Sequence, residues 1–304
     1  MKPVFILFVF LAFVPGTTAL LYEKGETILT ALKIPLSARA QAMGGAGVAC
    51  VNDGASATLN PAGLCNIGQD QIFLEHINYL QNMRTEFLSA VLLYPKVKIG
   101  VALQYFDLGE GPVVGEDGSD YSVDNTFHAF DMALMLTGQF KVKGVEAGLT
   151  LKVLREDIWY YSSSGLALDM GVIHRGLVKN LTLGASLLNL GWTGAFDVKR
   201  YPLTSILRAG AAYEYPLSDR LTLTGAADLN VSNDKSVTLP LGMEAAWEFF
   251  SLRAGVHLFH DTRSFSLGGG VSIGSFTLDY SYIHFTEDLN VNGRPHFFAL
   301  TLLI

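Results

Sequence analysis

Side chains that could carry catalysis are spread along this sequence without a recognisable catalytic spacing. The chain contains no H-E-x-x-H or phosphate-loop pattern, and its G-x-S-x-G run, Gly270–Gly274, falls in a stretch that alternates like a strand and not at a strand-to-helix elbow. Its histidines mostly fall within or beside stretches that alternate like strands: His76, His128, His174, His257, His260, His284 and His296. A Ser-His-Asp site can be assembled from distant residues and then leaves no motif. A hydrolase therefore stays as the least favoured hypothesis, and we predict that the protein is not an enzyme and uses no cofactor.

Two cysteines, Cys50 and Cys65, lie 15 residues apart near the start of the chain. In an oxidising compartment they could form a disulfide, and closing so short a loop would stabilise the fold by about 3 kcal/mol. The alternative is a pair of buried thiols. Two cysteines alone are too few ligands for a structural zinc site, so we assign no metal ligand to them.

Acidic residues gather in one stretch that could offer oxygen ligands to calcium. They are Asp107, Glu110, Glu116, Asp117, Asp120 and Asp124. Their spacing is not that of an EF-hand, so a calcium site and a solvated acidic loop over residues 108–125 both stay open.

The overall composition favours a membrane protein and excludes a nucleic-acid partner. Hydrophobic residues make up 50% of the 304 residues, charged residues only 16%, and the net charge is −7. A nucleic-acid-binding surface would need a basic footprint instead. Residues 1–19 combine Lys2, an apolar run from Val4 to Val14 and the small residues Thr17-Thr18-Ala19, which predicts a cleaved export signal.

The remainder of the chain alternates polar and apolar residues with the period of a β-strand. In Leu221–Ser232, for example, Leu221, Leu223, Leu229 and Val231 alternate with polar or small residues. The pattern predicts strands at 70–79, 84–94, 96–107, 126–139, 144–156, 165–174, 180–190, 204–215, 220–231, 238–248, 251–260, 264–273, 275–286 and 295–304. Short turns are expected on one rim and longer loops on the other, among them 108–125, 157–164 and 191–203, with both chain termini on the short-turn rim. An even number of such strands in an exported chain predicts an all-β fold, a 14-stranded antiparallel transmembrane β-barrel over residues 69–304.

Charged side chains on the polar faces of these strands should then face the lumen, since each would be costly against lipid. The main ones are Asp131, Lys152, Asp169, Arg208, Asp228, Glu244, Arg253 and Asp279. Their mixed signs indicate a salt-bridged interior and not a ring of one charge around an open pore.

The stretch Ser37–Leu64 has neither a helical nor a strand period and is rich in glycine and alanine. We predict that residues 20–68 form an N-terminal hatch that plugs the lumen, with Arg39 paired to a lumen acid. The expected gate residues are Arg39, Met43, Gly44, Gly45, Gly47, Asn60, Pro61, Ala62, Gly63 and Leu64, although turns alone could also require the glycines and the proline.

Several phrases of the sequence, in order, resemble those of the PorV/PorQ outer-membrane proteins, which in turn are similar to the FadL transporters. They include Ser37-Ala38-Arg39-Ala40, Asn60-Pro61-Ala62-Gly63-Leu64, Leu188-Asn189-Leu190-Gly191, Leu252-Arg253-Ala254-Gly255 and Leu278-Asp279-Tyr280-Ser281-Tyr282. The resemblance implies a fourteen-stranded barrel with a hatch in the bacterial outer membrane, where its lipid would be a partner. It also implies one of two activities, which are the transport of hydrophobic small molecules or a scaffold role that holds secreted proteins in a type IX-like system.

Overall fold

The protein is a closed barrel of fourteen antiparallel strands within the part of the chain that the structure describes. This computed structural model describes residues 22–304 except 24, 113–125, 197, 261 and 287–292. The strands are β1 Gln71–Asn78, β2 Arg84–Leu93, β3 Val97–Pro112, β4 Thr126–Val142, β5 Val145–Ile158, β6 Tyr161–Arg175, β7 Leu181–Thr193, β8 Ile206–Pro216, β9 Leu221–Ser232, β10 Val237–Trp247, β11 Phe250–Leu258, β12 Arg263–Ile273, β13 Phe276–Phe285 and β14 His296–Leu303. Each strand pairs with its neighbours in sequence, and β1 pairs with β14 to close the wall. The fourteen-stranded transmembrane barrel predicted from the alternation is confirmed.

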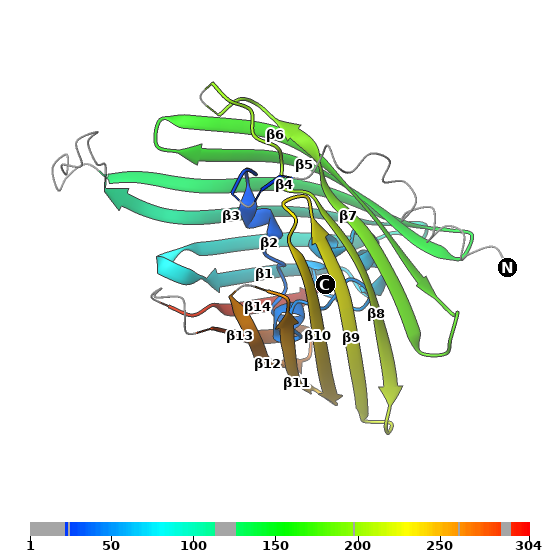
Figure 1. Cartoon of the computed structure of the whole chain (residues 1–304). Helices are drawn as coiled ribbons and strands as arrows, with labels where there is room; N and C mark the ends of the chain where they lie inside the picture. Colours follow the sequence, from blue (N-terminus) through cyan, green and yellow to red (C-terminus); the bar gives the residue numbers. More distant parts are fainter. Residues whose placement is uncertain (1–21, 24, 113–125, 197, 261, 287–292) are drawn as a thin grey trace.

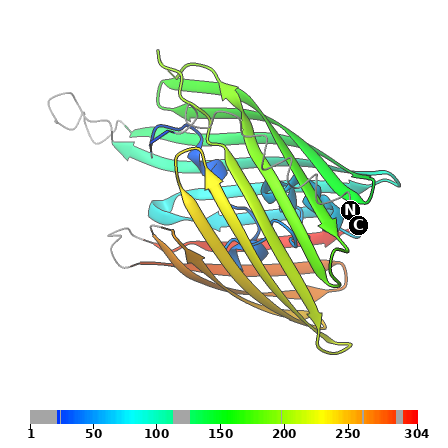
Figure 2. The same ribbon diagram turned by 45° about the vertical axis from the view of Figure 1, so that its right-hand side comes forward.

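Alternation along each strand separates an apolar outer surface from a mixed inner one. In β4 the side chains of Leu134 and Leu136 are 50% and 53% exposed, whereas Ala133, Met135 and Thr137 between them are buried. This is the pattern of a wall that meets lipid on its outside. Figures 1 and 2 show that the strands tilt strongly, so that β8 to β11 cross β1 to β4 on the far side of the barrel.

Connections between strands differ from the predicted loops at one place. Residues 157–164 were expected to form a long loop, but β5 runs to Ile158 and β6 begins at Tyr161. Only Trp159 and Tyr160 remain as the turn, and Trp159 adopts a φ of 57°. The prediction was wrong because aromatic residues at a strand end were assigned to a loop, whereas exposed aromatics belong to strand ends at a membrane interface.

The N-terminal residues from Tyr22 to Gly68, called the N-terminal segment below, lie inside the barrel (Figure 2). They form only short helices: η2 Thr30–Lys33, α2 Ala38–Ala42, α3 Ser56–Leu59 and η3 Pro61–Asn66. Ser37 begins α2 by accepting a hydrogen bond from the Ala40 amide, and Pro61 begins η3, a position that requires no backbone donor. Such short helices cannot persist alone, so packing against the wall must hold them.

The N-terminal segment starts at the rim that carries the connections β3–β4, β7–β8 and β9–β10, here called the long-loop rim. The Tyr22 amide donates to the Asn233 carbonyl, Glu23 pairs with Lys235, and Ile28 forms a bridge with Leu203. Both termini were predicted to lie at the opposite, short-turn rim. The first described residues lie at the long-loop rim instead, because a hydrogen bond and an ion pair tie Tyr22 and Glu23 to the β9–β10 turn, and the N-terminus itself lies outside the described residues.

None of the described helices is long and apolar enough to cross a membrane. The predicted export signal at residues 1–19 lies outside the described residues.

Candidate functional site

Glycines in the wall let the N-terminal segment lie directly against it. Gly242 of β10 pairs with Gly255 of β11, and a Cβ atom on Gly255 would lie 2.0 Å from the Gly44 nitrogen. A Cβ on Gly242 would lie 2.4 Å from the Met43 carbonyl oxygen, and one on Gly268 of β12 would clash with Ala42. Glycine is the residue that permits such close approach of two backbones. These three glycines form a seat for residues 42–44.

A second glycine pair seats the other half of the N-terminal segment. Gly148 of β5 pairs with Gly171 of β6, and Cβ atoms there would overlap Pro61 and Asn60. The Asn60 side chain donates to the carbonyls of Val48 and Val172, and it accepts from the Ala62 amide at 3.0 Å. Asn60 and Pro61 therefore join the segment to the β5–β6 wall.

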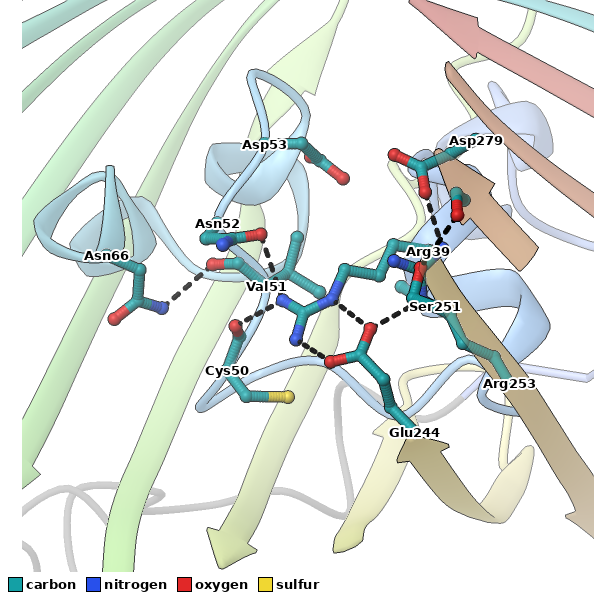
Figure 3. Close-up of polar contacts among 12 residues, drawn as sticks. Arg39, Cys50, Val51, Asn52, Asp53, Asn66, Glu244, Ser251, Arg253 and Asp279 are labelled. Carbon is teal, nitrogen blue, oxygen red and sulfur yellow. Dashed lines mark hydrogen bonds and ion pairs between the residues drawn. The ribbon is translucent and has the colours of Figure 1, made fainter. Parts of the chain in front are cut away.

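Arg39 forms the central charged contact between the N-terminal segment and the wall (Figure 3). Its Nε and Nη2 donate to the two carboxylate oxygens of Glu244 at 2.8 and 2.6 Å. Arg253 donates to the same carboxylate and also to Asp279. A bidentate guanidinium–carboxylate pair is strong and directional, so this network fixes the position of α2 against β10, β11 and β13.

Other lumen-facing acids hold backbone groups of the N-terminal segment. Asp228 accepts hydrogen bonds from the amides of Gly47 and Val48 at 2.7 and 3.0 Å. Glu75 of β1 accepts from the Ser37 amide at 2.9 Å. The Ser37 hydroxyl in turn donates to Asp53, and burial raises the pKa of that carboxyl to about 6, against the opposing effect of the Ser37 hydrogen bond.

A break in the wall lies at the long-loop end of β7. The pairing of β6 with β7 shifts between Leu168 and Met170, and Asn189 opposite this shift adopts a φ of 60°. Such a bulge reverses which side chains face outward, so Trp192 is 68% exposed while Thr193 is buried. Beyond Leu188, β7 has no residue paired with β8, which begins only at Ile206.

A cavity of about 470 Å³ occupies this break. It is lined by the buried Asn189 and Thr193, by the exposed Trp192, and by Tyr201 and Leu203 of the β7–β8 connection. Lys152 holds the bulge from within, donating to Asn189 at 2.6 Å and pairing with Asp169 at 2.8 Å. The lining of the cavity combines the buried Asn189 and Thr193 with the exposed Trp192 and Tyr201, so the cavity lies at the long-loop end of the wall between β7 and the β7–β8 connection.

A second cavity, of about 260 Å³, lies inside the lumen between the N-terminal segment and the long-loop rim. We call it the outer vestibule. Lys33, Gly44 and Gly45 line it from the segment, and Arg208, His257 and Arg263 line it from the wall. A third, polar cavity of about 360 Å³ lies on the other side of α2, around Arg39 and Glu244.

The outer surface carries an apolar hollow of about 920 Å³ over β1–β3 and β10–β14. Leu74, Leu88, Leu252, Leu278 and Phe298 in its lining are all exposed.

The residues predicted as a gate all lie in the lumen. Nine are buried, namely Met43, Gly44, Gly45, Gly47, Asn60, Pro61, Ala62, Gly63 and Leu64, and Arg39 is partly buried. The structure brings Arg39 to Glu244, Arg253 and Asp279, and Lys152 to Asp169. Asp131 lies opposite Glu156 on the neighbouring strand. It joins neither the Arg39 network nor the Lys152–Asp169 pair.

The two cysteines are free thiols in the structure, and no bridge joins them. Burial raises the pKa of Cys50 to about 12, and it also raises the pKa of Cys65. Neither is therefore an activated nucleophile. No group of three metal-ligating side chains occurs among the described residues, and residues 113–125 of the acidic stretch lie outside them.

Sequence reasoning missed Arg263 and the role of Asn189. From Ser266, which faces the lumen, strict alternation would point Arg263 outward, but a register shift between Arg263 and Phe265 turns it inward. Asn189 was used only through the resemblance of Leu188-Asn189-Leu190-Gly191 to a family phrase, and its bulge was not predicted. An asparagine beside a glycine within a strand is a signal for a bulge, because asparagine tolerates a left-handed backbone.

Several solved outer-membrane proteins have a fold similar to that of this chain. The toluene transporter TbuX of Ralstonia pickettii is similar with a TM-score of 0.64 at 12% identity, over 88% of this chain and 98% of that one. The monoaromatic hydrocarbon channel CymD has a TM-score of 0.64 at 14% identity, over 91% and 99%. A FadL homologue of Pseudomonas aeruginosa has a TM-score of 0.53 at 13% identity, over 87% and 97%.

No protein-family model matches the chain, and no curated protein matches it by sequence. At these identities the similarity establishes the fold alone, which is the barrel architecture of FadL-like outer-membrane proteins.

Proposed function

We propose that this protein is an outer-membrane channel that moves hydrophobic small molecules. The observation that carries the proposal is the cavity of about 470 Å³ between β7 and the β7–β8 connection, at the break in the wall. An apolar molecule gains little from a water-filled pore, whereas a lateral exit lets it leave directly into the hydrocarbon of the bilayer. Proteins of similar fold are described as toluene and monoaromatic hydrocarbon channels, which supports the same substrate class here.

The N-terminal segment makes an axial route unfavourable. Residues 42–44 lie against the glycine seat, and Arg39 and Asp228 bind the segment to the wall on its way through the lumen. A molecule that enters from the long-loop rim would have to displace these contacts to cross along the axis. The break at Asn189 offers a route that leaves them intact.

Localisation belongs to the same proposal. The chain would reach the outer membrane after removal of residues 1–19, and the barrel would insert there with its leucine-rich face in lipid. The PorV/PorQ assignment rests on the sequence phrases alone, and the export-scaffold role that it implies is retained as the alternative.

Deletion of Asn189 tests the proposed route. Removing the extra residue restores the alternation of β7, so that β7 can continue its pairing and the break closes. We expect uptake of radiolabelled toluene into proteoliposomes to fall at least tenfold. Asn189→Gly is the matched control, because glycine keeps the left-handed backbone and should leave uptake within twofold of wild type. Equal uptake by the deletion and by wild type would refute the lateral route.

A further inference from the structure

The outer vestibule concentrates basic groups that have no counter-charge in its lining. Arg208, Arg263 and Lys33 line it together with His257 and His260, and none of the described lining residues is Asp or Glu. Lys33 is paired with Asp234 outside the cavity. The two arginines are therefore left to face this space.

Arg208 is the most deeply buried of these basic groups. Its side chain is only 2% exposed, and its Nε and Nη1 are buried without a hydrogen-bond partner among the described residues. A buried guanidinium with unpaired N–H groups is costly. Asp228 and Asp169 act on Arg208 only as neighbouring charges. Asp228 uses Oδ2 to hold the Gly47 and Val48 amides, and its buried Oδ1 has no hydrogen-bond partner among the described residues.

Arg263 and His257 add further unpaired donors to the same space. Arg263 donates through Nη2 to the Tyr79 hydroxyl at 2.9 Å, but its Nε is buried and unpaired. The buried Nε2 of His257 is likewise without a partner in the described part of the chain. Water could satisfy single donors, but it cannot neutralise two guanidinium groups that share one cavity.

Apolar groups complete the lining, which therefore has two kinds of surface. Ile34, Pro35, Ile206 and Pro240 supply carbon surface beside the basic groups. The volume of about 260 Å³ suits a small organic molecule and excludes a long acyl chain lying wholly inside.

We propose that the outer vestibule is a binding site for the carboxylate of a small organic acid. Arg208 and Arg263 receive the carboxylate oxygens, for which the planar guanidinium is the matching donor. His257 donates a further hydrogen bond, and the apolar groups hold the rest of the molecule. The outer vestibule shares no lining residue with the cavity at the wall break, although Ile206 and Ser232 of the vestibule adjoin Ser205 and Asn233 of that cavity. The basic groups that define the site do not line the proposed transport route.

Calorimetric titration of the full-length protein in a non-ionic detergent tests this site, with benzoate as the probe and benzamide as its neutral isostere. Ionic strength is kept constant so that general screening is the same in every titration. We expect benzoate to bind and benzamide to bind at least tenfold more weakly. Inorganic phosphate should also be weaker than benzoate, because it cannot use the apolar surface. Equal affinity for benzamide, or tighter binding of phosphate, would overturn the assignment.

Two arginine variants locate the binding. Arg208→Gln and Arg263→Gln should each weaken benzoate binding at least tenfold. Arg220→Gln is the control, because Arg220 lies in the turn before β9 at the short-turn rim with a side chain that is 74% exposed, and its removal should leave the affinity unchanged. Equal weakening by all three variants would show a general charge effect and refute the site.

Crystals of the wild-type protein soaked with 4-bromobenzoate provide a test that needs no variant. The anomalous signal of bromine should appear in the outer vestibule, with the carboxylate toward Arg208. A signal confined to other places would refute the proposal. Deleting Asn189 should lower toluene uptake at least tenfold without altering benzoate binding, so failure of the transport proposal and failure of this one are distinguishable.

Discussion

At the scale of single residues, the lumen is organised by charged side chains that would be too costly anywhere else in the wall. Burying a guanidinium or carboxylate is unfavourable unless it is paired and hydrogen-bonded. Arg39 meets this condition through both oxygens of Glu244, through the Cys50 carbonyl and through Asn52. Arg208 does not meet this condition within the described residues. We therefore assign a structural role to Arg39 and a ligand-binding role to Arg208.

Arg39→Gln should loosen the N-terminal segment. Removing one member of a buried, hydrogen-bonded ion pair typically costs about 3 kcal/mol or more. We expect amide hydrogen exchange in residues 37–50 to become about 100-fold faster at constant pH, since 1.4 kcal/mol corresponds to a factor of ten. Arg220→Gln removes an exposed arginine and should change nothing. Unchanged exchange in Arg39→Gln would show that the glycine seat alone holds the segment.

Asp53 should make the N-terminal segment less stable as the pH rises. Burial raises its pKa from an ordinary value of 3.8 to about 6 in the folded protein, so the folded state holds its proton more tightly than the unfolded state does. The resulting stabilisation is complete below pH 4 and is lost as the pH rises through 6. Urea titration, read by a dye attached to Cys65, should show earlier release at pH 7.5 than at pH 5. Asp53→Asn should reduce that difference, and an equal difference in both proteins would argue against a protonated Asp53.

The sequence predicted which charges face inward better than it predicted their partners. Alternation alone identifies Glu244, Arg253 and Asp279, because each lies on the polar face of a regular strand. It fails at Arg263, where a register shift reverses the direction of the side chain. A bulge depends on backbone geometry that period-two counting does not contain.

At the scale of elements, the shared feature is the match between glycines in neighbouring strands and a short helix in the lumen. Gly242 and Gly255 face each other across β10 and β11, and the end of α2 lies on them. Strand glycines are usually a weakness because they add no packing. Here their missing side chains create the space that residues 42–44 occupy.

Gly255→Ala should displace the N-terminal segment without opening the barrel. The added Cβ would lie 2.0 Å from the Gly44 nitrogen, and such overpacking costs about 1–3 kcal/mol or more. We expect faster hydrogen exchange in residues 38–47. The folded barrel should still migrate on detergent gels as the wild-type protein does. Gly225→Ala is the control, because no atom lies within 4 Å of its Cβ position. Similar exchange in the two variants would contradict the glycine seat.

Strand positions were largely predictable, whereas the internal arrangement of the N-terminal segment was not. Most strand ends agree with the alternation to within a few residues, because one face of each strand must meet lipid. The segment from Ser37 to Leu64 has no such constraint. Its short helices are fixed by lumen contacts such as Asp228 with Gly47 and Val48, which join residues about 180 positions apart.

At the scale of the whole molecule, closure of the wall gives each edge of every strand a hydrogen-bonded neighbour. β14 pairs on one side with β13 and on the other with β1. In a bilayer an unpaired strand edge has no water to replace the lost hydrogen bonds. The wall is therefore a single unit that should not tolerate the loss of a strand.

Deletion of residues 296–304 should prevent assembly of the barrel. It removes β14 and exposes the edges of β1 and β13. We expect no heat-modifiable, fast-migrating form on detergent gels, and we expect complete digestion by protease. Ile304→Ala is the control, because the Ile304 side chain is exposed and only its backbone amide bonds to Asp70. A band of folded protein from the deletion variant would mean that thirteen strands can form a closed barrel.

The attachment of Tyr22 and Glu23 to the β9–β10 turn has a consequence for how the polypeptide is threaded. Inside the lumen the chain runs once from the long-loop rim at Tyr22 to the short-turn rim at Gln71, before it begins to build the wall around this segment. A bulky group attached at Glu23 would therefore lie at the opposite rim of the barrel from one attached at Ile304. Any molecule inside the lumen shares that space with the N-terminal segment.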